Sequence, residues 1–177
     1  MEQPAGVGTP ALQRGNASMG LPKRKHLRRL ERIFDGTREP LYYLTCCVHS
    51  RIPVLARPDI AEVLETAWRE AEQVHRWLVG RFVVMPDHVH FFASPCGEEG
   101  KSLSQFMESW KRWTQREIRQ RGIVSFRWQK EFFDHLLRSD ESYGGKWDYV
   151  RENPVRERLV TSPDEWPFQG EVYPLEW

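Results

Sequence analysis

The sequence predicts an α+β domain in which an antiparallel sheet carries helices on one face. The order of β-rich and helical runs is strand, helix, strand, strand, helix. The second and third strands are joined by so short a turn that they must pair antiparallel. The chain has 177 residues, of which 40% are hydrophobic and 29% charged. These values suit one compact domain with a sizeable core and tails.

The first half of this pattern begins with Leu41–Val48, a β-rich run that we expect to form a largely buried strand. A helix is expected to begin at Pro58, because apolar residues recur after it at helical spacing. These residues are Ile60, Val63, Leu64, Ala67 and Ala71.

Trp77–Val84 and His88–Ser94 are the second and third predicted strands, and Met85-Pro86-Asp87 between them is a turn signal.

A second long helix is expected after the third strand, with Ser102 or Ser104 as its N-cap and an end near Arg119. One face of it is apolar. The residues of that face are Leu103, Phe106, Trp110, Trp113 and Ile118. We expect the two tryptophans to lie in the core, although exposed rings of this kind can also stack on bases.

Basic residues of the same helix lie largely off its apolar face. Lys111, Arg112 and Arg116 are therefore candidates for contact with DNA phosphates.

The second half of the pattern is less regular. Residues 126–137 (FRWQKEFFDHLL) are apolar and rich in aromatic residues, and the sequence leaves open whether they form a strand or a helix. Asp140–Asn153 reads as a helix that ends at Pro154, because the residue before a proline resists helical geometry.

The N-terminal region differs in composition from the rest. Residues 1–22 contain Pro, Gly, Ala and Ser without periodicity, which is typical of disorder. Residues 1–39 hold eight Lys or Arg against four Asp or Glu, whereas the rest of the chain holds 18 against 21. Such a basic arm gains affinity for phosphates by counterion release, although a solvated tail is the alternative. Its candidate DNA-binding residues are Lys23, Arg24, Lys25, Arg28 and Arg29.

Several classes of protein are disfavoured by what the sequence lacks. No apolar run approaches the ~20 residues of a membrane helix, and the N-terminus has no segment of signal-peptide type, so we expect a cytoplasmic protein. The sequence contains no G-x-x-x-x-G-K-[ST] string, which excludes the nucleotide chemistry of P-loop proteins. Three cysteines, two of them adjacent, favour reduced thiols over disulfides. A zinc site formed by Cys46, Cys47 and His49 is a weaker alternative.

The first chemical motif is His88-Val89-His90 at the start of a predicted strand. Residues i and i+2 of a strand point to one face, so both imidazoles lie within reach of one metal ion. Imidazole is a common ligand of such ions. The Pro86-Asp87 turn favours this interpretation, because it places the pair at a strand start. The alternative is that one or both histidines are ordinary core or surface residues.

The second motif is Tyr149 with Asn153, which share a face if the segment is helical. An amide oxygen is a possible third metal ligand. A phenol is a weak nucleophile while protonated, with an ordinary pKa near ~10. A metal on the scissile phosphate makes its attack feasible, and the product is a covalent phosphotyrosine.

Each residue of the second motif has an ordinary alternative. Asn153 followed by Pro154 fits the N-cap of a further helix, residues 154–160. Tyr149 fits an amphipathic helix. Tyr143 is a competing nucleophile, but Trp147 stands where its amide partner would be needed.

Together the motifs resemble the single-tyrosine HUH transposases of the insertion-sequence-200 type, and within them the REP-associated tyrosine transposases. Residues 82–94 (FVVMPDHVHFFAS) look like the HUH segment, and residues 147–160 (WDYVRENPVRERLV) look like the tyrosine helix and its Asn-Pro turn. Residues 127–129 (RWQ) and 132–138 (FFDHLLR) are similar to the connecting segment. The resemblance covers residues 40–168.

The resemblance implies a ferredoxin-like fold with the histidines on a central strand. His88, His90 and Asn153 would bind Mg²⁺ or Mn²⁺. Tyr149 would attack single-stranded DNA beside a hairpin, leaving a 5′-phosphotyrosine and a free 3′-OH. Asp87 departs from the family, in which Asn is frequent at this position, and its carboxylate would be close enough to support a histidine or the metal.

The expected organisation is a disordered tail and basic arm over residues 1–39, the transposase domain over 40–168, and an aromatic C-terminal tail over 169–177. Two other functions fit the same residues. One is a hairpin-binding regulator without chemistry, and the other is a metal-dependent phosphodiesterase on RNA or nucleotides in which water attacks. The sequence is compatible with a monomer or a homodimer.

Overall fold

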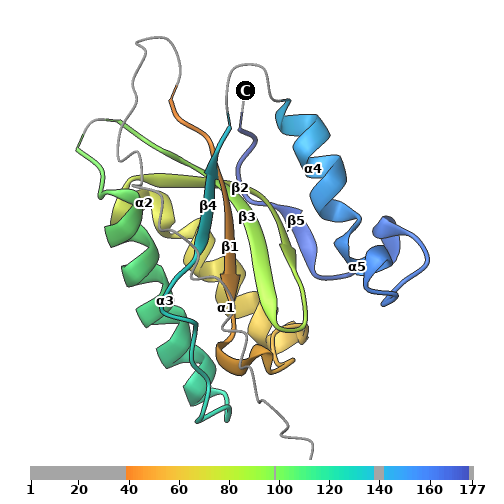
Figure 1. The fold of residues 1–177 in the computed structure, drawn as a ribbon. Coiled ribbons are helices and arrows are strands. Elements are labelled where there is room, and N and C mark those ends of the chain that lie inside the picture. The colour runs from red at the N-terminus through yellow and green to blue at the C-terminus, as the bar shows by residue number, and fades with distance from the viewer. Residues whose placement is uncertain (1–38, 98, 138–141, 176–177) are drawn as a thin grey trace, which may run out of the picture.

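A five-stranded sheet forms the centre of the molecule, which a computed structural model describes over residues 39–97, 99–137 and 142–175 (Figure 1). The strands are β1 (Tyr42–Cys47), β2 (Trp77–Val84), β3 (His88–Pro95), β4 (Phe133–Leu136) and β5 (Gln169–Glu171). Their order is β4-β1-β3-β2-β5, and every neighbouring pair is antiparallel. The α+β prediction is confirmed, and β3, which carries the histidines, is the central strand.

The β2–β3 hairpin sets the position of the histidines. Its turn closes where the Met85 amide donates to the His88 carbonyl at 2.8 Å. In the register that follows, Val83 lies opposite His90. Because alternate residues of a strand face opposite sides, His88 and His90 point to one side of the sheet.

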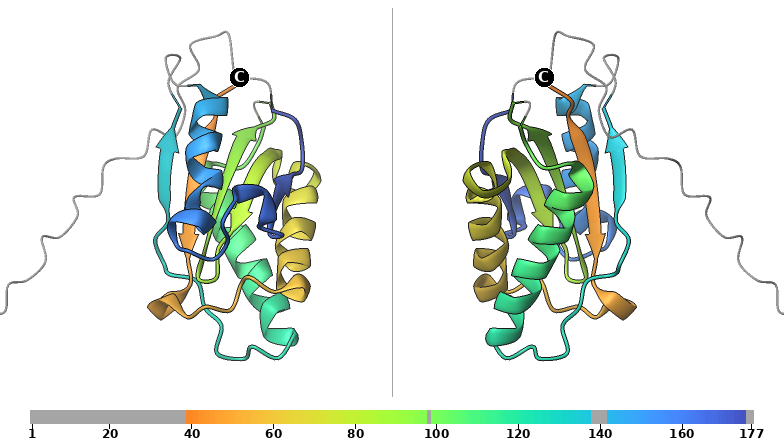
Figure 2. Two further views of the ribbon diagram at one scale, coloured as in Figure 1. Left: turned by 90° about the vertical axis from the view of Figure 1, so that its right-hand side faces the viewer. Right: turned by 90° about the vertical axis from the view of Figure 1, so that its left-hand side faces the viewer.

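Helices α1 (Pro58–Arg69), α2 (Ala71–His75) and α3 (Leu103–Gln120) cover the other side (Figure 2). Between α1, α3 and β3 the rings of Trp68, Trp110 and Phe91 meet, with centroids 5.2–5.8 Å apart. All three side chains are almost fully buried. Of the two predicted caps of α3 it is Ser102 that serves, because its hydroxyl accepts from the Gln105 amide in a reciprocal capping box.

Helices α4 (Tyr143–Arg151) and α5 (Asn153–Arg156) lie on the histidine side of the sheet (Figure 2). The long helices thus share one face, as expected, and α4 packs on the opposite face over a second, smaller core. This cluster comprises Leu41, Tyr43, Val83, Met85, Phe92, Leu137, Tyr143, Val150 and Trp166.

Gly80 allows α4 to approach the sheet closely. It lies where the β2–β3 register shifts, between Val79 and Phe82. A Cβ at Gly80 would lie 2.7 Å from both the Tyr143 hydroxyl oxygen and a methyl carbon of Leu175. The missing side chain therefore leaves room for Tyr143, whose hydroxyl accepts a hydrogen bond from the Arg81 amide at 3.1 Å.

Several sequence expectations need correction or completion. The run 126–137 contributes only the four residues of β4, and its Phe126 and Trp128 are buried in the core. The helix predicted over residues 140–153 begins at Tyr143, where Ser142 is the cap, and ends at Arg151. Asp140 lies outside the described residues.

Both ends of the chain were expected to be tails. Most of the N-terminal arm, up to residue 38, lies outside the described residues. The C-terminal aromatic region docks onto the domain, where β5 pairs with β2 and the Tyr173 hydroxyl donates to the Arg69 carbonyl. Within the described ranges, no helix is long and apolar enough to cross a membrane.

The tryptophan cluster yields a stability prediction. Trp110→Ala should destabilise the fold by about 3–5 kcal/mol, because it leaves a cavity between α1, α3 and β3. Trp110→Phe should cost less, since the buried Trp110 indole N–H has no hydrogen-bond partner among the described residues. Urea unfolding followed by circular dichroism measures both. Arg112→Ala, on the exposed side of the same helix, is the control and should change stability by less than about 0.5 kcal/mol. A Trp110→Ala cost as small as that of the control would contradict the prediction.

Candidate functional site: a histidine pair beneath the tyrosine helix

His88 and His90 form a close pair on the α4 side of β3. Their Nε2 atoms are 3.0 Å apart, and their rings are nearly perpendicular at 85°. Only 6% of His88 and 8% of His90 is exposed. The alternation predicted from the sequence therefore holds, and the Nε2 atoms of the two rings lie next to each other.

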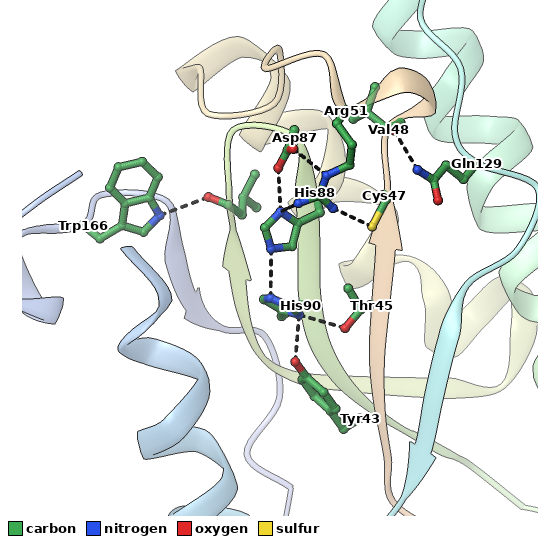
Figure 3. Close-up of polar contacts among 11 residues, drawn as sticks. Tyr43, Thr45, Cys47, Val48, Arg51, Asp87, His88, His90, Gln129 and Trp166 are labelled. Atoms are coloured by element: carbon green, nitrogen blue, oxygen red, sulfur yellow. Dashed lines mark hydrogen bonds and ion pairs between the residues drawn. The ribbon is translucent and has the colours of Figure 1, made fainter. Parts of the chain in front are cut away.

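The outer nitrogen of His88 is held by a carboxylate. His88 Nδ1 lies 2.6 Å from Asp87 Oδ1, and Asp87 Oδ2 lies 2.7 Å from Arg51 Nε (Figure 3). Arg51 in turn donates to the Cys47 thiol sulfur at 2.8 Å. A carboxylate at Nδ1 favours the proton on that nitrogen, which leaves a lone pair on Nε2.

The outer nitrogen of His90 faces two hydroxyls. Tyr43 Oη and Thr45 Oγ1, both on β1, each lie 2.8 Å from His90 Nδ1 (Figure 3). Burial lowers the pKa of His90 to about 3, and positive charge on His88, Arg156 and Arg51 adds to this effect. His90 is therefore neutral at ordinary pH, which is the state in which imidazole binds metals.

The pair fits a divalent cation. Two nitrogens bound at right angles, each about 2.1 Å from one ion, are about 3.0 Å apart, which is the separation found here. Within the described ranges, no cluster of three or more His, Cys, Asp or Glu side chains has a metal-binding arrangement. Two imidazoles would thus need further oxygen ligands, such as an amide, water or phosphate.

The alternative zinc site formed by Cys46, Cys47 and His49 is wrong. Cys46 belongs to the core beneath α1 and α3, whereas the next residue on the strand, Cys47, points to the opposite face and accepts from Arg51. Adjacent residues of a strand cannot direct both thiols to one ion. None of the three cysteines, all of which lie in the described residues, forms a disulfide.

Helix α4 runs across the histidine face. Its first residue, Tyr143, packs on Phe92 of β3 with ring centroids 4.9 Å apart. One turn later Lys146 Nζ lies 5.3 Å from the centre of the Tyr43 ring, whose hydroxyl contacts His90. The C-terminal turn of the helix is therefore carried toward the histidines.

The two candidate nucleophiles have opposite environments. Tyr143 is buried, its hydroxyl accepts from the Arg81 amide, and burial raises its pKa to about 12. Tyr149 is 62% exposed. Burial raises the pKa of Tyr43, and the hydrogen bond from Thr45 partly offsets this rise. Of the two phenols, Tyr149 is thus the one accessible from solvent.

Asn153 does not act as the N-cap that the Asn-Pro pair suggested. The cap position of α5 is Glu152, which makes no capping side-chain bond. Asn153 Nδ2 instead donates to the Val150 carbonyl at 2.8 Å, and Asn153 Oδ1 accepts from Arg156 Nη2 at 2.5 Å. The same Nη2 donates to the Tyr149 carbonyl at 2.8 Å. Both residues of the second motif therefore contact the guanidinium of Arg156, a residue that neither sequence motif includes.

The predicted DNA-binding residues fall into three groups. The cluster over residues 23–29 lies outside the described residues. Lys111 donates to the carbonyl oxygens of Gln129, Lys130 and Glu131, so its ammonium holds the segment before β4. Arg112 and Arg116 line a hollow on α3, which covers the side of the sheet remote from the histidines (Figure 2). The other residues of this hollow are Gln115, Arg119 and Gln120.

Comparison with known proteins agrees with this arrangement. A Haemophilus influenzae protein named as a REP-associated tyrosine transposase is 24% identical over 159 residues, which are 81% of this chain and 90% of that protein. A solved structure of a REP-associated tyrosine transposase bound to a REP hairpin has a TM-score of 0.61 and 22% identity, and covers 75% of this chain and 76% of its own. This likeness shows a shared fold.

The family described as "Transposase IS200 like" matches residues 38–143 of the chain. The matched stretch contains both histidines, their supporting residues Tyr43, Thr45 and Asp87, and the central hairpin; it ends before Tyr149. Because the match spans more than half of the sequence and coincides with the strands that build the histidine site, the chain belongs to the IS200-like transposase family.

Proposed function

We propose that the chain is a metal-dependent, single-stranded DNA endonuclease and strand transferase that acts beside hairpins through a 5′-phosphotyrosine on Tyr149. The observation that carries this proposal is the pair of imidazole Nε2 atoms, 3.0 Å apart, on the face of the sheet across which α4 presents an exposed tyrosine.

His88, His90 and Asn153 are the residues that would hold Mg²⁺ or Mn²⁺. When bound, such a cation polarises a phosphoryl oxygen and neutralises charge that develops on it. The chain contributes orientation. Asp87 fixes the His88 ring from its outer nitrogen, and the hydroxyls of β1 do so for His90.

In the proposed reaction the Tyr149 phenol oxygen attacks a backbone phosphorus. A P–O(Tyr149) bond forms, the bond from phosphorus to the 3′ oxygen breaks, the phenol proton passes to water, and the departing 3′ oxygen takes up a proton. The new phosphotyrosine is a phosphodiester, so a 3′-OH can attack it in turn and join strands. The exposed position of Tyr149 suits a polymeric substrate, which a buried phenol such as that of Tyr143 could not reach.

A DNA hairpin is the proposed partner, as in the solved relative that is bound to a REP hairpin. The basic arm over residues 23–29 is proposed to contact its phosphates. Arg112 and Arg116 are proposed as contacts for a part of the DNA away from the cleaved bond, since they lie on the far side of the sheet. Contact of Lys111 with a phosphate stays a prediction, because its ammonium already donates to three backbone carbonyls.

One prediction of the proposed function concerns the nucleophile. Incubation with labelled hairpin-flanked single-stranded DNA and Mn²⁺ should give a covalent adduct on a denaturing gel, and Tyr149→Phe should abolish it. Tyr143→Phe is the matched control. It should keep the adduct and lose about 1 kcal/mol of stability with its hydrogen bond to Arg81.

Three outcomes would contradict this assignment. An adduct that survives Tyr149→Phe would move the chemistry to another nucleophile. Binding of the hairpin without any adduct or cleavage would favour a catalytically silent regulator. Cleavage that persists in Tyr149→Phe without an adduct would indicate attack by water, as in a phosphodiesterase.

The second prediction concerns metal affinity and needs no DNA. Asp87→Ala should weaken Mn²⁺ binding about 10–100-fold, because the His88 ring loses the carboxylate that orients it. His88→Ala should remove binding. The loss of the free-ion Mn²⁺ signal in electron paramagnetic resonance measures the affinity. Asp59→Ala, which removes an exposed carboxylate paired with Arg57, is the control. Equal affinities of Asp87→Ala and Asp59→Ala would rule out the supporting role of Asp87.

A further inference from the structure

One guanidinium joins the proposed nucleophile to the proposed oxygen ligand. Arg156 Nη2 donates to the Tyr149 carbonyl at 2.8 Å and to Asn153 Oδ1 at 2.5 Å. The guanidinium carbon also lies 4.3 Å from the centre of the Tyr149 ring. Three separate contacts therefore converge on this side chain, and each involves a residue of the tyrosine motif.

Part of this arrangement is explained by helix architecture alone. Helix α4 ends at Arg151, so the Tyr149 carbonyl is among the last four and lacks a partner within the helix. A cation at a helix C-terminus is also favourable. Capping does not explain the other two contacts, because neither the ring of Tyr149 nor the amide oxygen of Asn153 is a helix carbonyl.

Arg156 also has unused binding capacity. A guanidinium has five N–H donors, and the hydrogen bonds to Tyr149 and Asn153 both come from Nη2. In the described part of the chain, no carboxylate pairs with Arg156 and no hydrogen bond involves its Nε or Nη1. The side chain is exposed. A cation without an anionic partner among the described residues thus lies against the ring of Tyr149.

Phosphate is the ligand that these features suit. A planar guanidinium can stack on an aromatic ring with its face and donate within its plane at the same time, whereas an ammonium cannot do both. Charge-assisted bonds from arginine to phosphate oxygens are among the strong hydrogen bonds in proteins. The guanidinium lies over the ring of Tyr149, the residue whose phenol is proposed to attack a phosphate.

Building on the proposed function, we propose that Arg156 positions Tyr149 through its ring and binds a non-bridging oxygen of the phosphate that Tyr149 attacks. The guanidinium stays protonated throughout and forms no covalent bond. As the P–O(Tyr149) bond forms and the P–O3′ bond breaks, negative charge grows on the non-bridging oxygens, and preorganised N–H donors there stabilise it.

The kinetic test compares three variants in single-turnover adduct formation at saturating hairpin DNA and Mn²⁺. Arg156→Ala should slow the reaction about 100-fold, the effect of losing a preorganised donor to developing charge. Arg156→Lys keeps the charge but loses the planar stack, so a loss of about tenfold is expected. Arg158→Ala removes the same charge two residues later and should stay within about twofold of the parent protein, because that side chain is exposed and joins none of these contacts.

Binding and kinetics separate this role from a general loss of structure or of DNA affinity. The hairpin dissociation constant of Arg156→Ala should stay within about threefold of that of Arg158→Ala, since one exposed cation among many contributes little to backbone binding. A rate of Arg156→Ala equal to that of Arg158→Ala would overturn the proposal. A rate loss that follows entirely from weaker hairpin binding would also overturn it.

A spectroscopic test needs neither DNA nor metal. With 3-fluorotyrosine at position 149, the ¹⁹F resonance should shift in Arg156→Ala, because the charged plane over the ring is gone, and should coincide with the parent resonance in Arg158→Ala. Unchanged resonances in both variants would overturn the positioning role. If the parent protein forms no adduct at all, the proposed function and the phosphate contact fail together, while the ¹⁹F comparison still decides whether Arg156 holds the tyrosine.

Discussion

Two imidazole nitrogens held 3.0 Å apart can coexist only if they do not both carry positive charge, and most of the surrounding structure serves this constraint. Burial disfavours protonation of His90, and the outer nitrogens of both rings are occupied by groups that keep the rings in place. When no cation is bound, one Nε2 atom must donate a hydrogen bond to the other. When a cation is bound, both Nε2 lone pairs can face the cation if the proton of His90 moves from Nε2 to Nδ1. There the N–H can donate to a hydroxyl of β1.

The constraint also explains why the histidines lie on the central strand. A strand between two others receives support from both sides: β1 supplies Tyr43 and Thr45, and the turn from β2 supplies Asp87. The large tryptophan-rich core on the α1 and α3 side leaves the opposite face free for polar groups. The smaller cluster under α4 then needs only to hold the tyrosine helix against that face.

The local parts of the site followed from the sequence, and the long-range parts did not. Period-two alternation was enough to place His88 and His90 side by side, and caps and turns located most strands and helices to within a residue or two. Thr45 reaches His90 through a strand register between residues 45 positions apart, and no local pattern encodes such a pairing. The contacts of Lys111 are long-range in the same way: its charge is visible in the sequence, but the carbonyls that accept its hydrogen bonds belong to a loop some twenty residues away.

The break between α4 and α5 shows how a few bonds select a functional atom. A continuous helix would leave the Asn153 amide free to turn, so that either its oxygen or its nitrogen could face outward. Here Nδ2 donates to the Val150 carbonyl and Oδ1 accepts from Arg156. A flipped amide would place its N–H donor against the N–H donor of Arg156, and its oxygen against the carbonyl oxygen of Val150. The two bonds therefore leave the oxygen as the atom with spare acceptor capacity, and oxygen is the atom that Mg²⁺ requires. Since an amide oxygen has two lone pairs, Arg156 can keep its hold on one of them while the other remains available to a cation.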